Sequence, residues 1–209
     1  MSQRERLKDL LLERSVRRGD FVLASGARSS YYVDCRIAAT AAEGQALIGA
    51  LGFELLRESG LRPDVVGGLT MGADPVSYAI ARASWGSDQP VDAFTVRKQP
   101  KEHGTGKRIE GNFAAGQRAV VIEDVITSGG SALQACDAVE AEGGEVVGVL
   151  ALIDREAGGR EAIAARVAGR TSGGRDWHVQ VASYPSCNTT KAPQCRISGY
   201  VHAMVPVTK

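Results

Sequence analysis

The sequence lacks the features that mark membrane, secreted and metal-binding proteins. Its longest apolar run, VVGVLALI at 146–153, is far too short to span a bilayer. The charged first twenty residues contain no apolar core of a secretion signal. The four cysteines show no CxxC pair and no metal-ligand spacing; they are Cys35, Cys136, Cys187 and Cys195. These absences favour a cytoplasmic protein whose thiols are free.

An excess of charge of either sign is also missing. The formal net charge is +1, which gives no whole-chain argument for binding nucleic acid or a membrane surface. We therefore expect neither as a partner. The chain has 209 residues, of which 44% are hydrophobic, and this is enough for one α/β domain with a sizeable core.

Strand-like and helix-like segments alternate through the middle of the chain. Helical spacing of leucines predicts a first helix over 3–18, followed by short strand-like pieces at 21–26 and 30–34 and a helix at 41–59. After these we expect strands at 64–69, 91–97, 118–124 and 145–155, and helices at 73–84, 129–144 and 158–169. Nearly all-apolar strands of this kind predict a mostly parallel sheet flanked by helices.

The alternation stops near residue 169. We therefore expect a main domain at 1–169 and a C-terminal extension of uncertain structure at 170–209. Within the extension, 178–184 and 200–207 are possible strands.

The stretch VVIEDVITSGGS at 120–131 carries the strongest chemical signal. It contains neither the lysine of a Walker loop nor the GxGxxG spacing of a dinucleotide fingerprint. What it does contain is an apolar strand, the acids Glu123 and Asp124, and a small-residue loop that opens a helix. An ordinary strand-to-helix turn is one interpretation. Two adjacent acids at a buried strand end favour a functional one.

The loop and the acid pair match the two ends of a 5-phosphoribosyl group. Hydroxyls of Thr127, Ser128 and Ser131, together with amides at a helix N-terminus, suit a phosphate monoester. Two ionised carboxylates accept hydrogen bonds and suit the vicinal ribose hydroxyls. The pattern therefore predicts a phosphoribosyl site.

A second constellation lies at 95–111, TVRKQPKEHGTGKRIEG. Arg97, Lys98, Lys101 and His103 precede two glycines, which is typical of a mobile loop. A cationic loop can close over a polyanion and exclude water, although a solvated basic loop is the simpler alternative.

These motifs together resemble a known family. The stretch 119–131 resembles the phosphoribosyl pyrophosphate (PRPP) signature of type I phosphoribosyltransferases, and RKQPKEHGTG at 97–106 resembles the catalytic loop of orotate phosphoribosyltransferases. Three further matches follow the family's order: FVLASGARSSYYVDCR at 21–36, GGLTMGADPVSYAIA at 67–81 and DREAGG at 154–159. Ala24 stands where many members carry lysine, which leaves the precise orotate contacts open.

The resemblance implies a type I phosphoribosyltransferase fold with an N-terminal hood, and transfer of the phosphoribosyl group to orotate. It implies catalytic roles for Lys101, His103 and Asp124, and orotate contacts from Thr127, Arg155 and Arg28. The implied PRPP-binding residues are Arg97, Lys98, Lys101, His103, Glu123, Asp124, Val125, Ile126, Thr127, Ser128, Gly129, Gly130 and Ser131. It further implies Mg²⁺ held mainly by substrate oxygens, with no direct protein ligand, and a homodimer whose catalytic loop serves the neighbouring site.

Two alternatives remain open from the residues. A phosphoribosyltransferase for another base would share the 120–131 signature but not the 97–106 or 154–159 motifs. A non-catalytic regulator that senses a nucleotide on the same fold would tend to lose the loop lysines or gain a DNA-binding domain.

Overall fold

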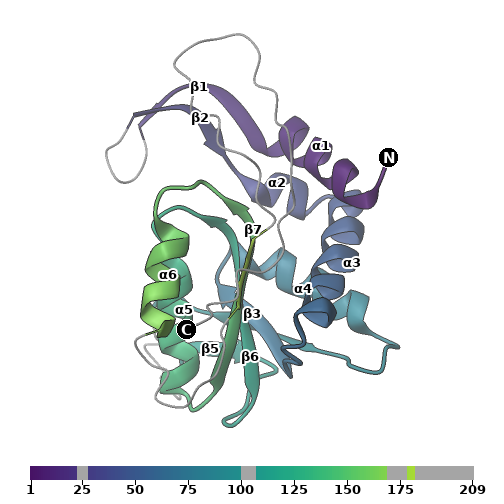
Figure 1. Cartoon of the computed structure of the whole chain (residues 1–209), viewed down its shortest axis with the longest axis vertical. Coiled ribbons are helices and arrows are strands. Elements are labelled where there is room, and N and C mark those ends of the chain that lie inside the picture. The colour runs from purple at the N-terminus through teal and green to yellow at the C-terminus, as the bar shows by residue number, and fades with distance from the viewer. Residues whose placement is uncertain (23–27, 100–106, 169–177, 182–209) are drawn as a thin grey trace.

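The computed structural model describes residues 1–22, 28–99, 107–168 and 178–181. A central sheet has helices on both sides, and a two-stranded hairpin lies at one end of it (Figure 1). The elements are α1 (Gln3–Ser15), β1 (Val16–Val22), β2 (Arg28–Val33), α2 (Cys35–Ala39), α3 (Ala42–Ser59), β3 (Val65–Leu69), α4 (Ala73–Ser84), β4 (Asp92–Val96), β5 (Ile109–Gly111), β6 (Arg118–Ile126), α5 (Gly130–Ala141), β7 (Glu145–Asp154), α6 (Gly159–Ala168) and β8 (His178–Val181).

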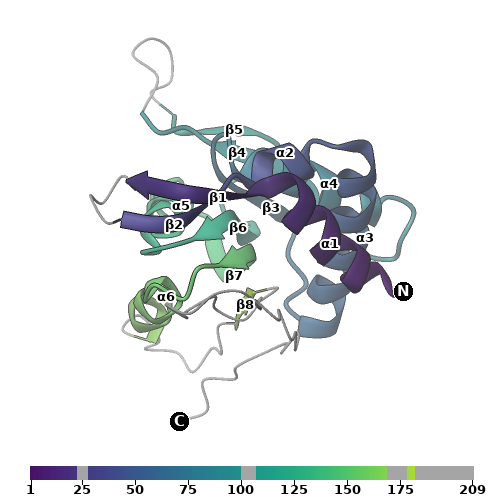
Figure 2. The same cartoon turned by 90° about the horizontal axis from the view of Figure 1, so that it is seen from above.

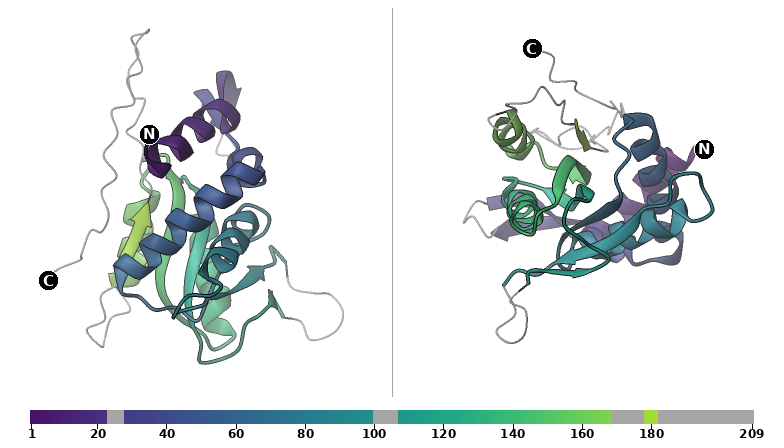
Figure 3. Two further views of the ribbon diagram at one scale, coloured as in Figure 1. Left: turned by 90° about the vertical axis from the view of Figure 1, so that its right-hand side faces the viewer. Right: turned by 90° about the horizontal axis from the view of Figure 1, so that it is seen from below.

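The sheet is almost entirely parallel. In the described part of the chain, its six strands follow the order β5-β4-β3-β6-β7-β8, and of their pairings only that of β5 with β4 is antiparallel. Parallel strands need crossover connections, and these are supplied by helices that cover the two faces. Figure 2 shows the hairpin lying across one end of the sheet, and Figure 3 shows α3 lying across one face. The predicted α/β fold is confirmed.

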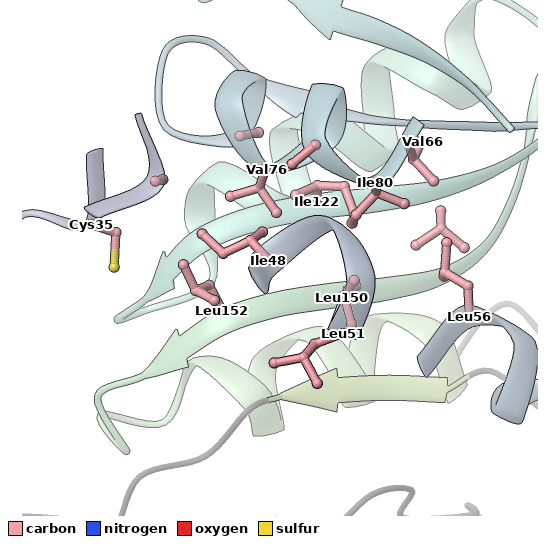
Figure 4. Packing of buried hydrophobic residues seen from close by; sticks show 14 of the residues in the cluster. Cys35, Ile48, Leu51, Leu56, Val66, Val76, Ile80, Ile122, Leu150 and Leu152 are labelled. Atoms are coloured by element: carbon pink, nitrogen blue, oxygen red, sulfur yellow. The ribbon is translucent and has the colours of Figure 1, made fainter. Parts of the chain in front are cut away.

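The core consists of two layers, one on each face of the sheet. Because side chains alternate along a strand, Val120 and Ile122 of β6 pack with α3 and α4, whereas Val121 packs on the opposite face with α5 and α6. Figure 4 shows the first layer, in which Ile48 and Ile80 of the helices meet Ile122. Burial on both faces accounts for the nearly continuous apolar sequence of the central strands.

The N-terminal segment differs from expectation at the end of its first helix and in its strand bounds, since strands expected at 21–26 and 30–34 lie at 16–22 and 28–33. A capping box between Ser2 and Glu5 starts α1, and the leucines on one face of this helix are buried. The helix ends at Ser15. The prediction of a helix over 3–18 was therefore wrong at its C-terminal end. Residues from Val16 onward pair with β2 as an antiparallel hairpin, and this pairing outweighs the helical preference of the two arginines that follow Val16.

Two short elements were not predicted. Helix α2 begins after Asp34, whose carboxylate accepts a hydrogen bond from the backbone N–H of Arg36. Strand β5 is a three-residue addition to the edge of the sheet. Together, α1, α2 and the hairpin form the N-terminal part expected as a hood.

Part of the C-terminal extension belongs to the sheet. Strand β8 pairs in parallel with residues 148–151 of β7, in the first half of the strand predicted at 178–184. The possible strand at 200–207 lies outside the described residues, and the boundary at 169 stays a prediction. In the part of the chain that the structure describes, no helix is long and apolar enough to cross a membrane.

Candidate functional site

The predicted site residues gather where the parallel strands end. Strands β3, β4, β6 and β7 all finish at the same edge of the sheet, beneath the hairpin (Figure 1). Backbone hydrogen bonds continue the ladder beyond these ends, from Thr70 N–H to the Val96 carbonyl at 2.9 Å and from Arg155 N–H to the Ile126 carbonyl at 2.9 Å. This edge is the usual ligand position in open α/β sheets.

The two carboxyl groups of the acid pair differ in burial. Glu123 is 7% exposed, whereas Asp124 is half-buried. Burial, followed by the charge of Asp124 and a hydrogen bond with it, raises the pKa of Glu123 to about 8. Asp124 accepts a hydrogen bond from the Val125 backbone N–H at 2.9 Å. The pair can therefore offer both an acceptor and, at neutral pH, a proton donor.

The charge of Asp124 also affects the buried thiol of Cys35 in α2. Its pKa is raised well above the usual value, first by burial and then by the negative charges of Asp124 and Asp34. The thiol therefore stays protonated. Cys35 and Cys136 are both buried.

The loop after the acid pair is built around close backbone contacts. Gly129 has φ +81°, in the left-handed region, and α5 starts at the next residue. Gly159, which opens α6, lies so near the loop that a Cβ there would be 2.5 Å from the Thr127 carbonyl oxygen. Ser128 and Ser131 are exposed beside the start of α5, so their hydroxyls and the first helix amides are open to an anion.

The other predicted members of the signature differ in burial. Val125 is half-buried and packs against one core layer, and Ile126 is buried in the other. Thr127 is half-buried, and Gly130 is exposed at the start of α5.

A loop not singled out for catalysis also reaches the acid pair. Residues 70–72 follow β3, and the peptide bond between Thr70 and Met71 is cis. The backbone of Gly72 approaches the Asp124 carboxylate so closely that any Cβ there would overlap it. The glycine in TMGAD could have signalled a close backbone contact at this position. The sequence alone does not show that the contact is with Asp124.

The cationic loop is described only at its two ends. Arg97, half-buried, forms an ion pair with Glu110 at 3.2 Å, and Lys98 is exposed. The Arg97 backbone N–H donates to the Arg108 carbonyl at 2.8 Å, which continues the pairing of β4 with β5. Lys101 and His103 lie outside the described residues, as does Ala24.

Arg155 connects the main sheet to the hairpin. Its guanidinium lies over the Tyr31 ring, 4.8 Å from the centroid, and donates to the Ser29 hydroxyl at 3.3 Å. Ser29 and Tyr31 are alternate residues of β2 and lie on one face of it. Arg28 is exposed and approaches Asp20 across the hairpin at 4.0 Å. The structure thus brings Arg155, but not Arg28, into a contact that fixes its orientation.

Comparisons with known proteins identify the family. A model of the phosphoribosyl transferase domain matches residues 39–186. The orotate phosphoribosyltransferase of Rhodopirellula baltica is 47% identical over 159 residues, which cover 74% of this chain and 82% of that protein. The chain belongs to the orotate phosphoribosyltransferase family. This confirms the resemblance predicted from the sequence motifs.

Solved structures of the family agree with the fold. The orotate phosphoribosyltransferase of Mycobacterium tuberculosis H37Rv, in complex with Fe(III) dicitrate, has a TM-score of 0.72 and 42% identity, covering 87% of this chain and 96% of that one. A structure of the same enzyme with 5-phospho-α-D-ribosyl 1-diphosphate has a TM-score of 0.65 and 36% identity, covering 87% of this chain and 88% of that one. The type I phosphoribosyltransferase fold is therefore confirmed.

Proposed function

We propose that the chain transfers the 5-phosphoribosyl group of PRPP to orotate, in the biosynthesis of pyrimidine nucleotides. The products are orotidine 5′-monophosphate and pyrophosphate. A bond forms between ribose C1 and the orotate ring nitrogen while the bond from C1 to the pyrophosphate oxygen breaks. The observation that carries the proposal is the juxtaposition of Glu123 and Asp124 with the glycine loop at the start of α5.

The acid pair is suited to the ribose. Asp124, half-buried and next to the loop at 70–72, can accept a hydrogen bond from a ribose hydroxyl. Glu123, whose pKa is raised to about 8, can donate its proton to the second hydroxyl at neutral pH. The charge of Asp124 also opposes the positive charge that develops on the ribose ring in an oxocarbenium-like transition state. The loop at 127–131, in which Ser128, Gly130 and Ser131 are exposed, would hold the 5-phosphate.

The pyrophosphate side requires positive charge. Arg97 and Lys98 come directly after β4, at the end of the sheet where the acid pair lies. Lys101 and His103 follow them in the chain. These cations would offset the negative charge of the departing pyrophosphate, and His103 would hydrogen-bond or protonate it.

We propose Mg²⁺ as the cofactor. Among the described residues, no cluster of three or more His, Cys, Asp or Glu side chains could hold a metal ion. Mg²⁺ would take its ligands mainly from PRPP oxygens, with no direct protein ligand, as the family resemblance implies. Bound there, Mg²⁺ would neutralise charge on the pyrophosphate.

Orotate recognition is assigned to Arg155, with Thr127 and Arg28 as further contacts. The contacts with Tyr31 and Ser29 hold the Arg155 guanidinium at the end of β7. A fixed planar guanidinium matches the planar carboxylate or imide face of orotate.

A spectroscopic assay tests the function. Purified protein with orotate, PRPP and Mg²⁺ should lose orotate absorbance, and omission of PRPP should abolish the change. Replacing orotate by uracil, adenine or hypoxanthine tests the alternative that the chain is a phosphoribosyltransferase for another base. Asp124→Asn should lower kcat about 10²-fold, as expected for loss of one transition-state electrostatic contact. Binding of PRPP without turnover of any base would favour a regulator instead.

We also propose a cytoplasmic homodimer in which Lys101 acts on the partner's site. The test mixes two inactive variants, Lys101→Ala and Asp124→Asn, by unfolding and refolding in equal amounts. Random pairing makes about half of the dimers mixed, and each mixed dimer has one intact site if the loop is shared. Activity should then return to about a quarter of wild type. No recovery, with mixed dimers shown to be present, would mean that each loop serves its own chain.

A further inference from the structure

Asp74 accepts side-chain hydrogen bonds from two separate segments of the chain. It lies in the first turn of α4, and each of its carboxylate oxygens accepts a different threonine hydroxyl. Thr70 donates to Oδ2 at 2.7 Å, and Thr95 donates to Oδ1 at 2.9 Å. The start of a helix favours a negative charge, so the carboxylate is stabilised in this position.

A fourth residue completes the network. The Tyr78 hydroxyl lies 2.9 Å from the Thr95 hydroxyl. Thr95 has a single proton, and it is committed to the Asp74 carboxylate, which can only accept when ionised. Tyr78 must therefore be the donor in this pair. The hydrogen bonds run in one direction, from Tyr78 through Thr95 to Asp74.

The two threonines lie at the ends of the neighbouring strands β3 and β4, beside the acid pair and the start of the cationic loop. Thr70 begins the loop at 70–72, whose Gly72 backbone touches the Asp124 carboxylate. Thr95 lies in β4, two residues before Arg97, where the cationic loop begins. On the proposed function, pyrophosphate departs from the ribose at Asp124 and meets the cations that follow β4, so these two segments would flank it.

We propose that Asp74 is a positioning residue that fixes the 70–72 loop relative to the end of β4, and so sets the geometry in which pyrophosphate is held. The inference rests on the proposed function. Asp74 touches no reacting atom; it acts through Thr70 and Thr95. Small displacements of groups that position a substrate cost far more activity than stability.

The test uses threonine variants that differ only in the hydroxyl group. Thr70→Val and Thr95→Val keep the shape of the side chain and remove the donor, whereas Thr70→Ser and Thr95→Ser keep the donor. The valine variants should raise the KM for PRPP, and for pyrophosphate in the reverse reaction, by about tenfold. The KM for orotate should change less than twofold, and the serine variants should restore near wild-type values.

Asp74→Asn and Tyr78→Phe test the remaining links. Asp74→Asn should raise the KM for PRPP at least as much as either valine change, and adding Thr70→Val should increase it little further because both act through one carboxylate. Tyr78→Phe should have a smaller effect in the same direction. Asp88→Asn, an exposed acid beyond the far end of α4, serves as the control for an acid-to-amide change.

The outcomes separate the inference from the proposed function. Wild-type turnover of orotate establishes the function whatever the variants do. Equal rises in the KM values for orotate and PRPP, in parallel with a lower melting temperature, would show a general structural role and overturn the inference. Unchanged KM values in the valine variants would overturn it as well. If Asp74→Asn does not fold, the valine and serine pairs decide alone.

Discussion

Replacing Glu123 by glutamine removes a titratable group from the buried end of β6 and keeps its size and hydrogen-bonding capacity. In the folded chain the pKa of Glu123 is raised from an ordinary 4.5 to about 8, first by burial and then by the charge of Asp124. Between these pH values the unfolded chain releases a proton that the folded chain keeps. Ionisation therefore favours unfolding, and the contribution present below pH 4.5 is lost as pH rises through 8.

The magnitude follows from the same two values. Each pH unit between 4.5 and the working pH is worth about 1.4 kcal/mol, so at pH 7 the wild type should have lost about 3 kcal/mol relative to pH 4.5 through this group. Glu123→Gln cannot ionise and does not incur this loss. Its stability relative to wild type should therefore increase steadily from pH 5 to pH 8.

Urea unfolding of both proteins at pH 5, 6, 7 and 8, without PRPP, measures this difference. Glu161→Gln, which changes an exposed acid in α6, is the matched control and should show a constant difference from wild type over the same range. A difference between Glu123→Gln and wild type that is also independent of pH would refute the reasoning. It would mean that Glu123 ionises in the folded chain as readily as in the unfolded one.

Two further predictions concern the loop beside the acids and the end of the chain. Gly159→Ala should lower the free energy of unfolding by about 1–3 kcal/mol and raise the KM for PRPP, because the added Cβ would meet the Thr127 carbonyl oxygen at 2.5 Å. Gly130→Ala, whose Cβ would meet only the Ser128 hydroxyl at 3.7 Å, should leave the melting temperature near that of wild type, and an equal loss in both variants would contradict the packing argument. Ending the chain after residue 168 removes β8 and exposes the edge of β7, so we expect aggregation, whereas ending it after residue 186 keeps β8 and should leave soluble protein. Size-exclusion chromatography of the two truncated chains checks this, and soluble, active protein from the shorter one would show that β8 is dispensable.

Most of the main sheet was predictable because its signals are local. Strands β6 and β7 are apolar runs of the right length for strands buried on both faces, and the helices between them have clear start and stop residues. The hairpin was harder to predict. The sequence VRRGDFV of β1 is largely exposed, so no apolar alternation marks it, and leucine spacing alone extended the preceding helix into it.

The position of the site could be predicted from the order of the strands, but its contacts could not. Parallel strands place all their carboxyl ends at one edge, so the chain order of the motifs already predicts that Glu123, Arg155 and the segment after β3 lie near one another. It does not predict which atoms touch.

The contact of Arg155 with Ser29 spans 126 residues, and that of Asp74 with Thr95 spans 21. Both depend on how far each strand extends past its neighbour and on the approach of the hairpin. The motifs therefore indicated the groups that we propose to meet the substrate, whereas the contacts made by Tyr31 and Asp74 became visible only in the assembled fold. No local sequence pattern marks such residues, because their roles come from contacts with residues that are distant in the sequence.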